Sequence, residues 1–355
     1  MDPVDRACAL HQRALDRLDA GDPRRARGLF TRALEIFQGL GPDTRGDVAN
    51  VRVERAAAAR ALGDLSAARA DLEEAIRLLK GARGRDVARL RARAGGDLTV
   101  VHLDRGEYKL ALAVARRAAK VADTLPAPDR APVFNALGMA CKYTANFREG
   151  LAAYRRAATA ARYAYPAGSL FHATLEHNLG GIHHTAGDAK KAEPHARKAV
   201  VLRRAHLGPA HPDTLADEAA LAAVLDLAGK FAEADELHRR VIAGFTATLG
   251  KRHPEVAHST GNYAAHLQLC GRTGEAARAH RRAVQLKWRA LGDFHPATSL
   301  ERQNLGELEL ARGRPELAAV LFKRALAGFR MHLGDAHPDT RDCRARLLAA
   351  QRAAR

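Results

Sequence analysis

The chain has 355 residues, of which 47% are hydrophobic and only 5% aromatic, and 58 Lys and Arg residues against 40 Asp and Glu residues give a net charge of +18. Its core must therefore be built from Ala, Leu and Val, a composition typical of closely packed helices. No segment approaches the roughly 18 uncharged apolar residues of a membrane span, and no secretory signal follows Met1. We expect a protein of the cytoplasm without membrane contact.

Taken in chain order, the sequence repeats one helical hairpin eight times. Each turn carries a Gly followed five residues later by Ala, and the two residues are exchanged in the fourth unit. A Gly at such a turn supplies the left-handed residue that ends the first helix. The eight pairs are Gly21/Ala26, Gly63/Ala68, Gly106/Ala111, Ala145/Gly150, Gly187/Ala192, Gly229/Ala234, Gly271/Ala276 and Gly313/Ala318.

Small residues recur seven positions before and seven positions after these landmarks. Because seven residues return to the same face of a helix, they predict a seam at which the two backbones of a hairpin approach closely. The first set is Ala14, Ala56, Thr99, Gly138, Gly180, Ala222, Ala264 and Gly306. The second set is Ala33, Ala75, Ala118, Ala157, Ala199, Val241, Ala283 and Ala325.

A second phrase, Leu-Gly-x-x-His-Pro, links the later hairpins and recurs every 42 residues. Its Pro suits the first turn of the next helix, where the missing N–H is not needed. The four copies begin at Leu207, Leu249, Leu291 and Leu333. Within the third linker, the segment from Thr298 to Glu301 also matches a capping box.

A single hairpin cannot bury its apolar face alone, so the units must stack. The sequence predicts an all-α, right-handed solenoid of eight helical hairpins plus a C-terminal capping helix at about residues 338–354. We expect a single superhelix over residues 1–355, with irregular units at about 5–165 and regular 42-residue units at about 170–337. Pro126, Pro128 and Pro132 predict a longer or bent joint near residues 122–133.

These features resemble the tetratricopeptide repeat, in particular its kinesin-light-chain-like subclass with 42-residue units. The resemblance is closest at residues 176–180, Glu-His-Asn-Leu-Gly, and residues 187–194, Gly-Asp-Ala-Lys-Lys-Ala-Glu-Pro. It is strong over residues 170–340 and generic over residues 5–165. A motor subunit is not expected, because no sustained heptads for a coiled coil are present. The Arg- and Ala-rich composition and the bare repeat array look more like a stand-alone bacterial member. The family implies a non-catalytic scaffold that receives a peptide or a partner helix on its first-helix surface.

The resemblance also implies that Asn residues of the first helices hydrogen-bond the backbone of a bound peptide. Asn178, Asn262 and Asn304 share this place, with Gln12 in the first unit. The alternative is an Asn that bonds between neighbouring repeats. The other residues expected on this face are Asn50, Arg60, Arg93, Lys142, Tyr143, His177, His184, His258, Gln268 and Gln303. Cations and amides predominate over carboxylates such as Asp19, Asp104, Asp226 and Glu307, which indicates an anionic or backbone-exposing ligand. A merely solvated face is an equal alternative.

The 17 histidines do not predict a metal site. Four belong to the linker phrase, and His238 and His280 take the place of Phe30, Tyr154 and Phe322, which predicts packing. A cluster remains at His172, His177, His183, His184 and His195, but no carboxylate or Cys stands at ligand spacing beside it. No cofactor is expected.

No sequence pattern of a catalytic site is present either. Gly-x-Ser-x-Gly, a phosphate-binding loop and His-Glu-x-x-His are all missing from the sequence. The cysteines are widely spaced without a Cys-x-x-Cys pair, so neither a disulfide framework nor a zinc site is indicated. They are Cys8, Cys141, Cys270 and Cys343, and all fall on expected repeat helices. The chain is therefore not expected to be an enzyme.

The basic balance leaves the partner open. Arg pairs recur along the second helices and predict a stripe on the outer face, at Arg24-Arg25, Arg116-Arg117, Arg155-Arg156, Arg203-Arg204, Arg239-Arg240 and Arg281-Arg282. Arg suits phosphate through its planar fork, and helical repeats can bind RNA. We favour a solvated outer face as the interpretation of these pairs, with an acidic protein partner as the next alternative and nucleic acid after it. We favour a protein-interaction scaffold, which could serve as an accessory or regulatory subunit of a larger complex. The alternatives are an RNA-binding solenoid and a peptide-sensing regulator.

Overall fold

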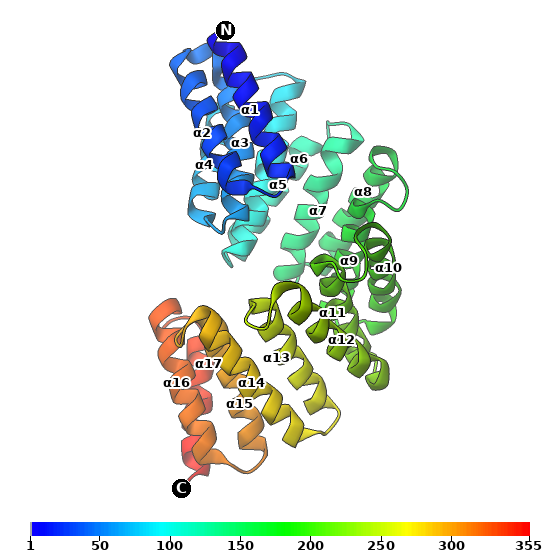
Figure 1. Cartoon of the computed structure of the whole chain (residues 1–355), viewed down its shortest axis with the longest axis vertical. Coiled ribbons are helices and arrows are strands. Elements are labelled where there is room, and N and C mark those ends of the chain that lie inside the picture. The colour runs from blue at the N-terminus through cyan, green and yellow to red at the C-terminus, as the bar shows by residue number, and fades with distance from the viewer. Residues whose placement is uncertain (1) are drawn as a thin grey trace. The chain divides into compact units, whose positions relative to one another are not determined.

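The computed structural model describes residues 2–355 and is all-α over that part of the chain (Figure 1). The predicted all-α architecture of repeated helical hairpins with a C-terminal helix is confirmed. A 3-10 turn at Pro42–Thr44 precedes the third helix. The helices are α1 (Pro3–Asp19), α2 (Pro23–Gly39), α3 (Arg45–Ala61), α4 (Leu65–Leu78), α5 (Arg85–Asp104), α6 (Tyr108–Ala122), α7 (Ala127–Tyr143), α8 (Phe147–Ala164), α9 (Leu170–Thr185), α10 (Ala189–Leu207), α11 (Pro212–Leu227), α12 (Phe231–Leu249), α13 (Pro254–Leu269), α14 (Thr273–Leu291), α15 (Pro296–Ala311), α16 (Pro315–Leu333) and α17 (Pro338–Ala353).

The helices form two compact units, one ending at residue 186 and one spanning residues 187–355. In the first unit, hairpins α1–α2, α3–α4, α5–α6 and α7–α8 stack in chain order, and α9 packs on α7 and α8. In the second unit, α10 packs on α11, and the hairpins α11–α12, α13–α14 and α15–α16 are followed by α17. The prediction of one continuous superhelix stays a prediction. None of the described helices is long and apolar enough to cross a lipid bilayer.

The hairpin turns use the left-handed glycines that the sequence predicts. Gly63 and Gly229, for example, have φ values of 77° and 72°. In the fourth unit the same conformation falls on Ala145, with φ 56°, and Ala145 is the one residue other than Gly with a positive φ among residues 2–355. The fold therefore requires this conformation even where the sequence does not supply a Gly.

Replacing Ala145 with Gly is expected to stabilise the first unit by about 1 kcal/mol, because the left-handed conformation costs an L-residue roughly 1–2 kcal/mol and Gly adopts it freely. Chemical unfolding followed by circular dichroism measures the change. Ala113, exposed in the middle of α6, is the matched control, since Gly there should cost about 1 kcal/mol. A loss of stability at both positions would contradict the argument.

The linker histidines cap the helices that follow them. Each accepts, through Nδ1, a hydrogen bond from the backbone N–H two residues later, and the Pro between them opens the helix. The distances are 3.1 Å at His211, 3.2 Å at His253 and His295, and 3.3 Å at His337. These bonds satisfy N–H groups that a helix start leaves without partners. The structural role expected for these histidines is confirmed.

The core consists mainly of Ala, Leu and Val, as the composition predicts, and the small residues lie where helices approach closely. A Cβ atom added to Gly138 would lie 2.4 Å from the ring of the fully buried Tyr154. The corresponding distance from Gly306 to the Phe322 ring is 2.8 Å. At both places the first helix has a Gly, and an aromatic ring of the second helix fills the space that a side chain would occupy.

The joint near the three prolines is not longer than the others, since α6 ends at Ala122 and α7 begins at Ala127. The bend that was its alternative stays a prediction. The repeat is shorter there because α6 has 15 residues, whereas α12 has 19. The expected capping box is absent as well, because His295 caps α15 and Glu301 is buried against other partners.

Candidate functional site

The residues predicted for the binding face fall into two sets, one in each unit, and each set is described by itself. Eight lie in the first unit, namely Asn50, Arg60, Arg93, Lys142, Tyr143, His177, Asn178 and His184. Five lie in the second unit, namely His258, Asn262, Gln268, Gln303 and Asn304. All are on first helices, but their surroundings differ.

Two of the three predicted cations neutralise carboxylates of the chain itself. Arg93 of α5 holds Glu54 of α3 with two hydrogen bonds of 2.6 and 2.9 Å. Arg60 of α3 donates to Asp104 of α5 at 2.7 Å. These pairs tie neighbouring hairpins together. The first-helix face of the first unit is therefore less positive than the sequence suggested.

Asp97 of α5 occupies the repeat position that Asn178 holds in α9. Burial raises the pKa of Asp97 to about 6, against the opposing effect of Arg93, whose Nε is 3.9 Å away. Its side chain nevertheless keeps 46% of its surface exposed. This residue was not predicted from the sequence, although it stands at the same repeat position as Asn178.

Lys142 is the predicted cation that remains available. It has no ion-pair partner among residues 2–355. Its Nζ lies 4.8 Å from the centre of the Tyr143 ring, and Tyr143 stacks on Tyr108 at 5.0 Å. Burial lowers the pKa of Lys142. The two rings are exposed by 49% and 39%, so a cation and an aromatic surface are presented side by side.

Two predicted amides serve the fold instead. Asn178 is 5% exposed and donates to Asn135 Oδ1 at 2.8 Å, which is the alternative role of a bond between neighbouring repeats. Gln303 is 7% exposed and donates to Asp342 of α17 at 2.9 Å. Neither is placed to meet a ligand without rearrangement.

The remaining predicted residues are at least partly accessible. Asn50, Asn262 and Asn304 are partly exposed, and their side-chain amides have no hydrogen bond within residues 2–355. His258 and Gln268 are exposed. His177 and His184 are partly buried and have interactions of their own.

The outer Arg pairs do not form the single stripe that was predicted. Four pairs share one register, but Arg24-Arg25 and Arg203-Arg204 stand at other places of their repeats. Many members also bind carboxylates: Arg116 holds Glu149 with bonds of 2.9 and 2.6 Å, and Arg281 reaches the fully buried Glu309. Part of the positive charge thus connects neighbouring hairpins.

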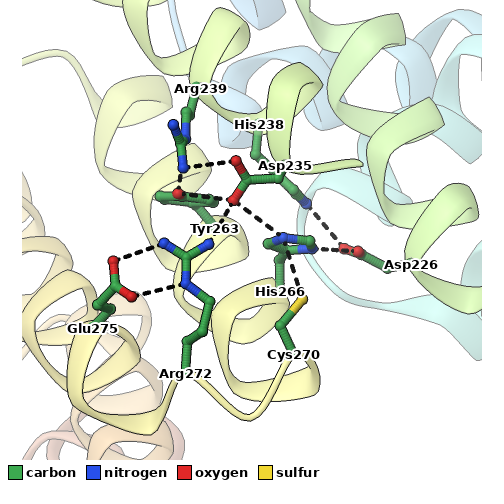
Figure 2. Close-up of polar contacts among 9 residues, drawn as sticks. All are labelled: Asp226, Asp235, His238, Arg239, Tyr263, His266, Cys270, Arg272 and Glu275. Atoms are coloured by element: carbon green, nitrogen blue, oxygen red, sulfur yellow. Dashed lines mark hydrogen bonds and ion pairs between the residues drawn. The ribbon is translucent and has the colours of Figure 1, made fainter. Parts of the chain in front are cut away.

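A buried polar cluster, which the sequence analysis did not predict, lies in the second unit (Figure 2). His266 of α13 contacts Asp226 of α11 through Nδ1 at 2.5 Å, and His238 of α12 contacts the other oxygen through Nε2 at 2.9 Å. Asp226 was expected on the open face but is only 10% exposed. His238, predicted to be a packing residue, is buried yet hydrogen-bonded.

The same holds for His280, which was also predicted to pack. It is 2% exposed and contacts Glu301 through Nδ1 at 2.6 Å, and Lys287 Nζ lies 2.5 Å from the same carboxylate. The signal for both histidines was available in the sequence, because each is polar at a repeat position that is apolar elsewhere.

Cys270 caps the end of α13, and its Sγ lies 3.5 Å from His266 Nε2. With Asp226 behind the ring, the order Cys, His, Asp is that of a nucleophilic triad. Burial and the Asp226 carboxylate raise the pKa of the Cys270 thiol, however. An activated cysteine needs the opposite shift, so this arrangement does not support catalysis.

The sequence matches the family model of the tetratricopeptide repeat over residues 5–81, 171–247 and 255–331, more than half of the chain. The chain belongs to the tetratricopeptide repeat (TPR) family. TPR proteins are generally interaction scaffolds without catalytic activity. No curated protein sequence matches this TPR chain.

Solved structures share the fold. A Rap protein complexed with Competence and Sporulation Factor has a TM-score of 0.65 at 12% identity, covering 98% of both chains. NprR in complex with its cognate peptide NprX has a TM-score of 0.56 at 13% identity, covering 84% of this chain and 82% of the other. A Podosopora anserina protein with kinesin-light-chain-type, nearly identical TPR-like repeats has a TM-score of 0.50 at 20% identity, covering 59% and 99%. The expected kinesin-light-chain-like TPR fold is confirmed.

Proposed function

We propose that this TPR chain is a non-catalytic scaffold that binds an extended peptide or protein segment on the first-helix faces of its repeats. The TPR fold supports this, as do the Rap and NprR structures, which hold a factor and a peptide respectively. The four cysteines are unpaired, which is compatible with the reducing cytoplasm. An accessory subunit would bind a segment of a partner protein on this face, and a peptide-sensing regulator would bind a short peptide there.

The observation that carries the proposal is the pair of amides at Asn262 and Asn304. They occupy the same place in consecutive repeats, nine residues before the hairpin Gly, and both are partly exposed without internal hydrogen bonds within residues 2–355. A side-chain amide can donate to and accept from a peptide main chain without reading its sequence. Repetition along the array suits an extended segment, whose backbone groups also repeat.

In the first unit, Lys142 with Tyr143 and Tyr108 would supply one cation and an aromatic surface for the same class of ligand. Because Arg60 and Arg93 are in internal ion pairs, we propose one acidic group in the ligand opposite Lys142 rather than a strongly acidic partner. The RNA-binding alternative gains no support, because the chain's own carboxylates occupy Arg116 and Arg281.

Peptides selected from a displayed random library against the full chain test the proposal, with affinity measured by fluorescence polarisation. Each lost amide hydrogen bond should cost about 1 kcal/mol, so Asn262→Ala with Asn304→Ala should weaken binding roughly 30-fold. Arg282→Ala, on an exposed second-helix position without an ion pair, is the matched control and should change nothing.

Two results would count against the scaffold proposal. One is the absence of any selected peptide. The other is a set of peptides whose affinity survives the double Asn variant but falls in Arg282→Ala, since binding would then use the outer face.

A further inference from the structure

Two histidines of the second unit stand at core positions that other repeats fill with apolar residues. The place of His238 holds Phe30 in the first repeat and Phe322 in the eighth. The place of His266 holds Ile182 and Val224 in the two preceding repeats. Both histidines are buried, at 3% and 1% exposure. Packing alone would not require ring nitrogens at these places, since buried polar groups cost free energy unless they are paired.

Both rings point at one carboxylate. His266 Nδ1 and His238 Nε2 contact the two oxygens of Asp226 at 2.5 and 2.9 Å, as Figure 2 shows. One atom from each of the three residues lies within 4.8 Å of the other two. The three side chains come from helices α11, α12 and α13, so the tertiary structure and not a local motif assembles them.

The second ring nitrogen of His266, Nε2, also has polar neighbours. It lies 3.5 Å from Asp235 Oδ1 and 3.5 Å from Cys270 Sγ. Asp235 is itself fixed by Arg272 at 3.0 Å and by the Tyr263 hydroxyl at 3.1 Å. A carboxylate behind a histidine favours the proton on that nitrogen and leaves the other nitrogen free to bind a metal, which is the usual arrangement around metal-bound histidines.

The charges of the cluster leave room for a cation. Asp226, Asp235 and Glu275 face Arg239 and Arg272, so three carboxylates meet two guanidinium groups and one negative charge is left for a histidine proton or a bound cation to balance. At the equivalent position of the next repeat, His280 contacts Glu301, and a cation of the chain itself balances that carboxylate, because Lys287 Nζ lies 2.5 Å from it. Asp226 has no such Lys partner among the ion pairs of residues 187–355.

We propose that Asp226, His238 and His266 bind a divalent transition-metal ion, with Zn²⁺ the best match to two imidazoles and one carboxylate. The ion would replace the two histidine–carboxylate hydrogen bonds. Bonds of about 2.0–2.2 Å around tetrahedral zinc separate its ligand atoms by roughly 3.4 Å, so each of the two histidine–carboxylate contacts would lengthen by less than an ångström. The ion would join α11, α12 and α13 and thereby clamp two consecutive hairpins.

Titration of the full chain, purified without a histidine tag and stripped with a chelator, tests the site with Zn²⁺ alone. We expect one equivalent to bind and the thermal unfolding temperature to rise, since a ligand of the native state stabilises it. His238→Gln and Asp226→Asn should lose this binding, and Asp235→Asn should weaken it roughly 10- to 100-fold. His280→Gln, which removes a buried histidine at the equivalent position, is the matched control and should bind as the unchanged chain does.

A measurement on the unchanged chain guards against variants that fail to fold. Co²⁺ at this site should give the visible absorption of a four-coordinate nitrogen–oxygen site without a thiolate charge-transfer band. A thiolate band would assign the metal to Cys270 and overturn the proposed ligand set. Failure to bind one equivalent of Zn²⁺, or equal binding by folded His238→Gln, would overturn the site and leave the peptide-binding proposal untouched.

Discussion

Replacing Lys287 with Met is expected to destabilise the second unit by about 3–5 kcal/mol at neutral pH, because it leaves the buried Glu301 carboxylate without its cation and with His280 as its remaining partner. Lys287 Nζ lies 2.5 Å from Glu301 Oε2, and the two side chains are 11% and 3% exposed. The only tryptophan, Trp288, is the next residue on α14. Its fluorescence during urea unfolding therefore reports on the affected repeat.

The effect should depend on pH. Burial favours the neutral acid, but His280 and Lys287 outweigh it and hold the pKa of Glu301 below its ordinary value of 4.5. The pair thus contributes its full stability above about pH 4.5, and that contribution is lost as the pH falls through the lower pKa of the folded state. The difference between the original chain and Lys287→Met should accordingly shrink at acid pH.

Two further variants check the cause of the Lys287 effect. Lys323→Met removes an exposed lysine of α16 and should change stability by less than about 0.5 kcal/mol. Adding Glu301→Gln to Lys287→Met should recover most of the loss, because no buried charge remains and the amide can still meet His280. A double variant as unstable as Lys287→Met alone would contradict the account.

Replacing Gly138 with Ala is expected to cost about 1–3 kcal/mol, the usual range for overpacking a tight core. The added Cβ would lie 2.4–2.6 Å from three ring carbons of Tyr154, which is fully buried and has no room to withdraw. Hydrogen exchange of α7 and α8 should accelerate in this variant, since the two helices pack directly on each other.

Another repeat has a pair of residues that avoids this clash. The second hairpin has Ala56 and Leu72 at the two equivalent places. Gly138→Ala combined with Tyr154→Leu should therefore be more stable than the sum of the two single changes predicts, a positive coupling of contacting residues. Strict additivity would show that the two side chains do not meet in solution.

The repeat phrases explain why so much of the fold was predictable from the sequence. A Gly at each turn, a small residue seven positions away and a His-Pro linker act within one or two helical turns, so their consequences can be read locally. The left-handed glycines, the histidine caps and the close approach at Gly138 all follow from such short-range rules. Even Ala145 obeys the register, adopting the glycine conformation with φ 56°.

The candidate site was harder to predict, because a residue's availability depends on what its neighbours in other repeats do. Arg60 and Arg93 look like free cations in the sequence, but Asp104 and Glu54 reach them from adjacent hairpins. Gln303 was expected to meet a ligand and instead bonds to Asp342. For Asn178 the sequence left both roles open, and the structure shows the bond between repeats, to Asn135. The position of a residue in the repeat predicts the helix face on which it lies. It does not predict which side chain of the neighbouring repeat, about 40 residues away, will contact it.

The sequence by itself thus determined the repeat, its length, its turns and its family resemblance, since these rest on backbone conformation and on the spacing of small residues. Only the tertiary structure decided which polar groups are satisfied internally and which remain open. It also brought Asp226, His238 and His266 together from three helices. The physical reason is that burial and ion pairing depend on distances between atoms of different hairpins, and stacking sets those distances.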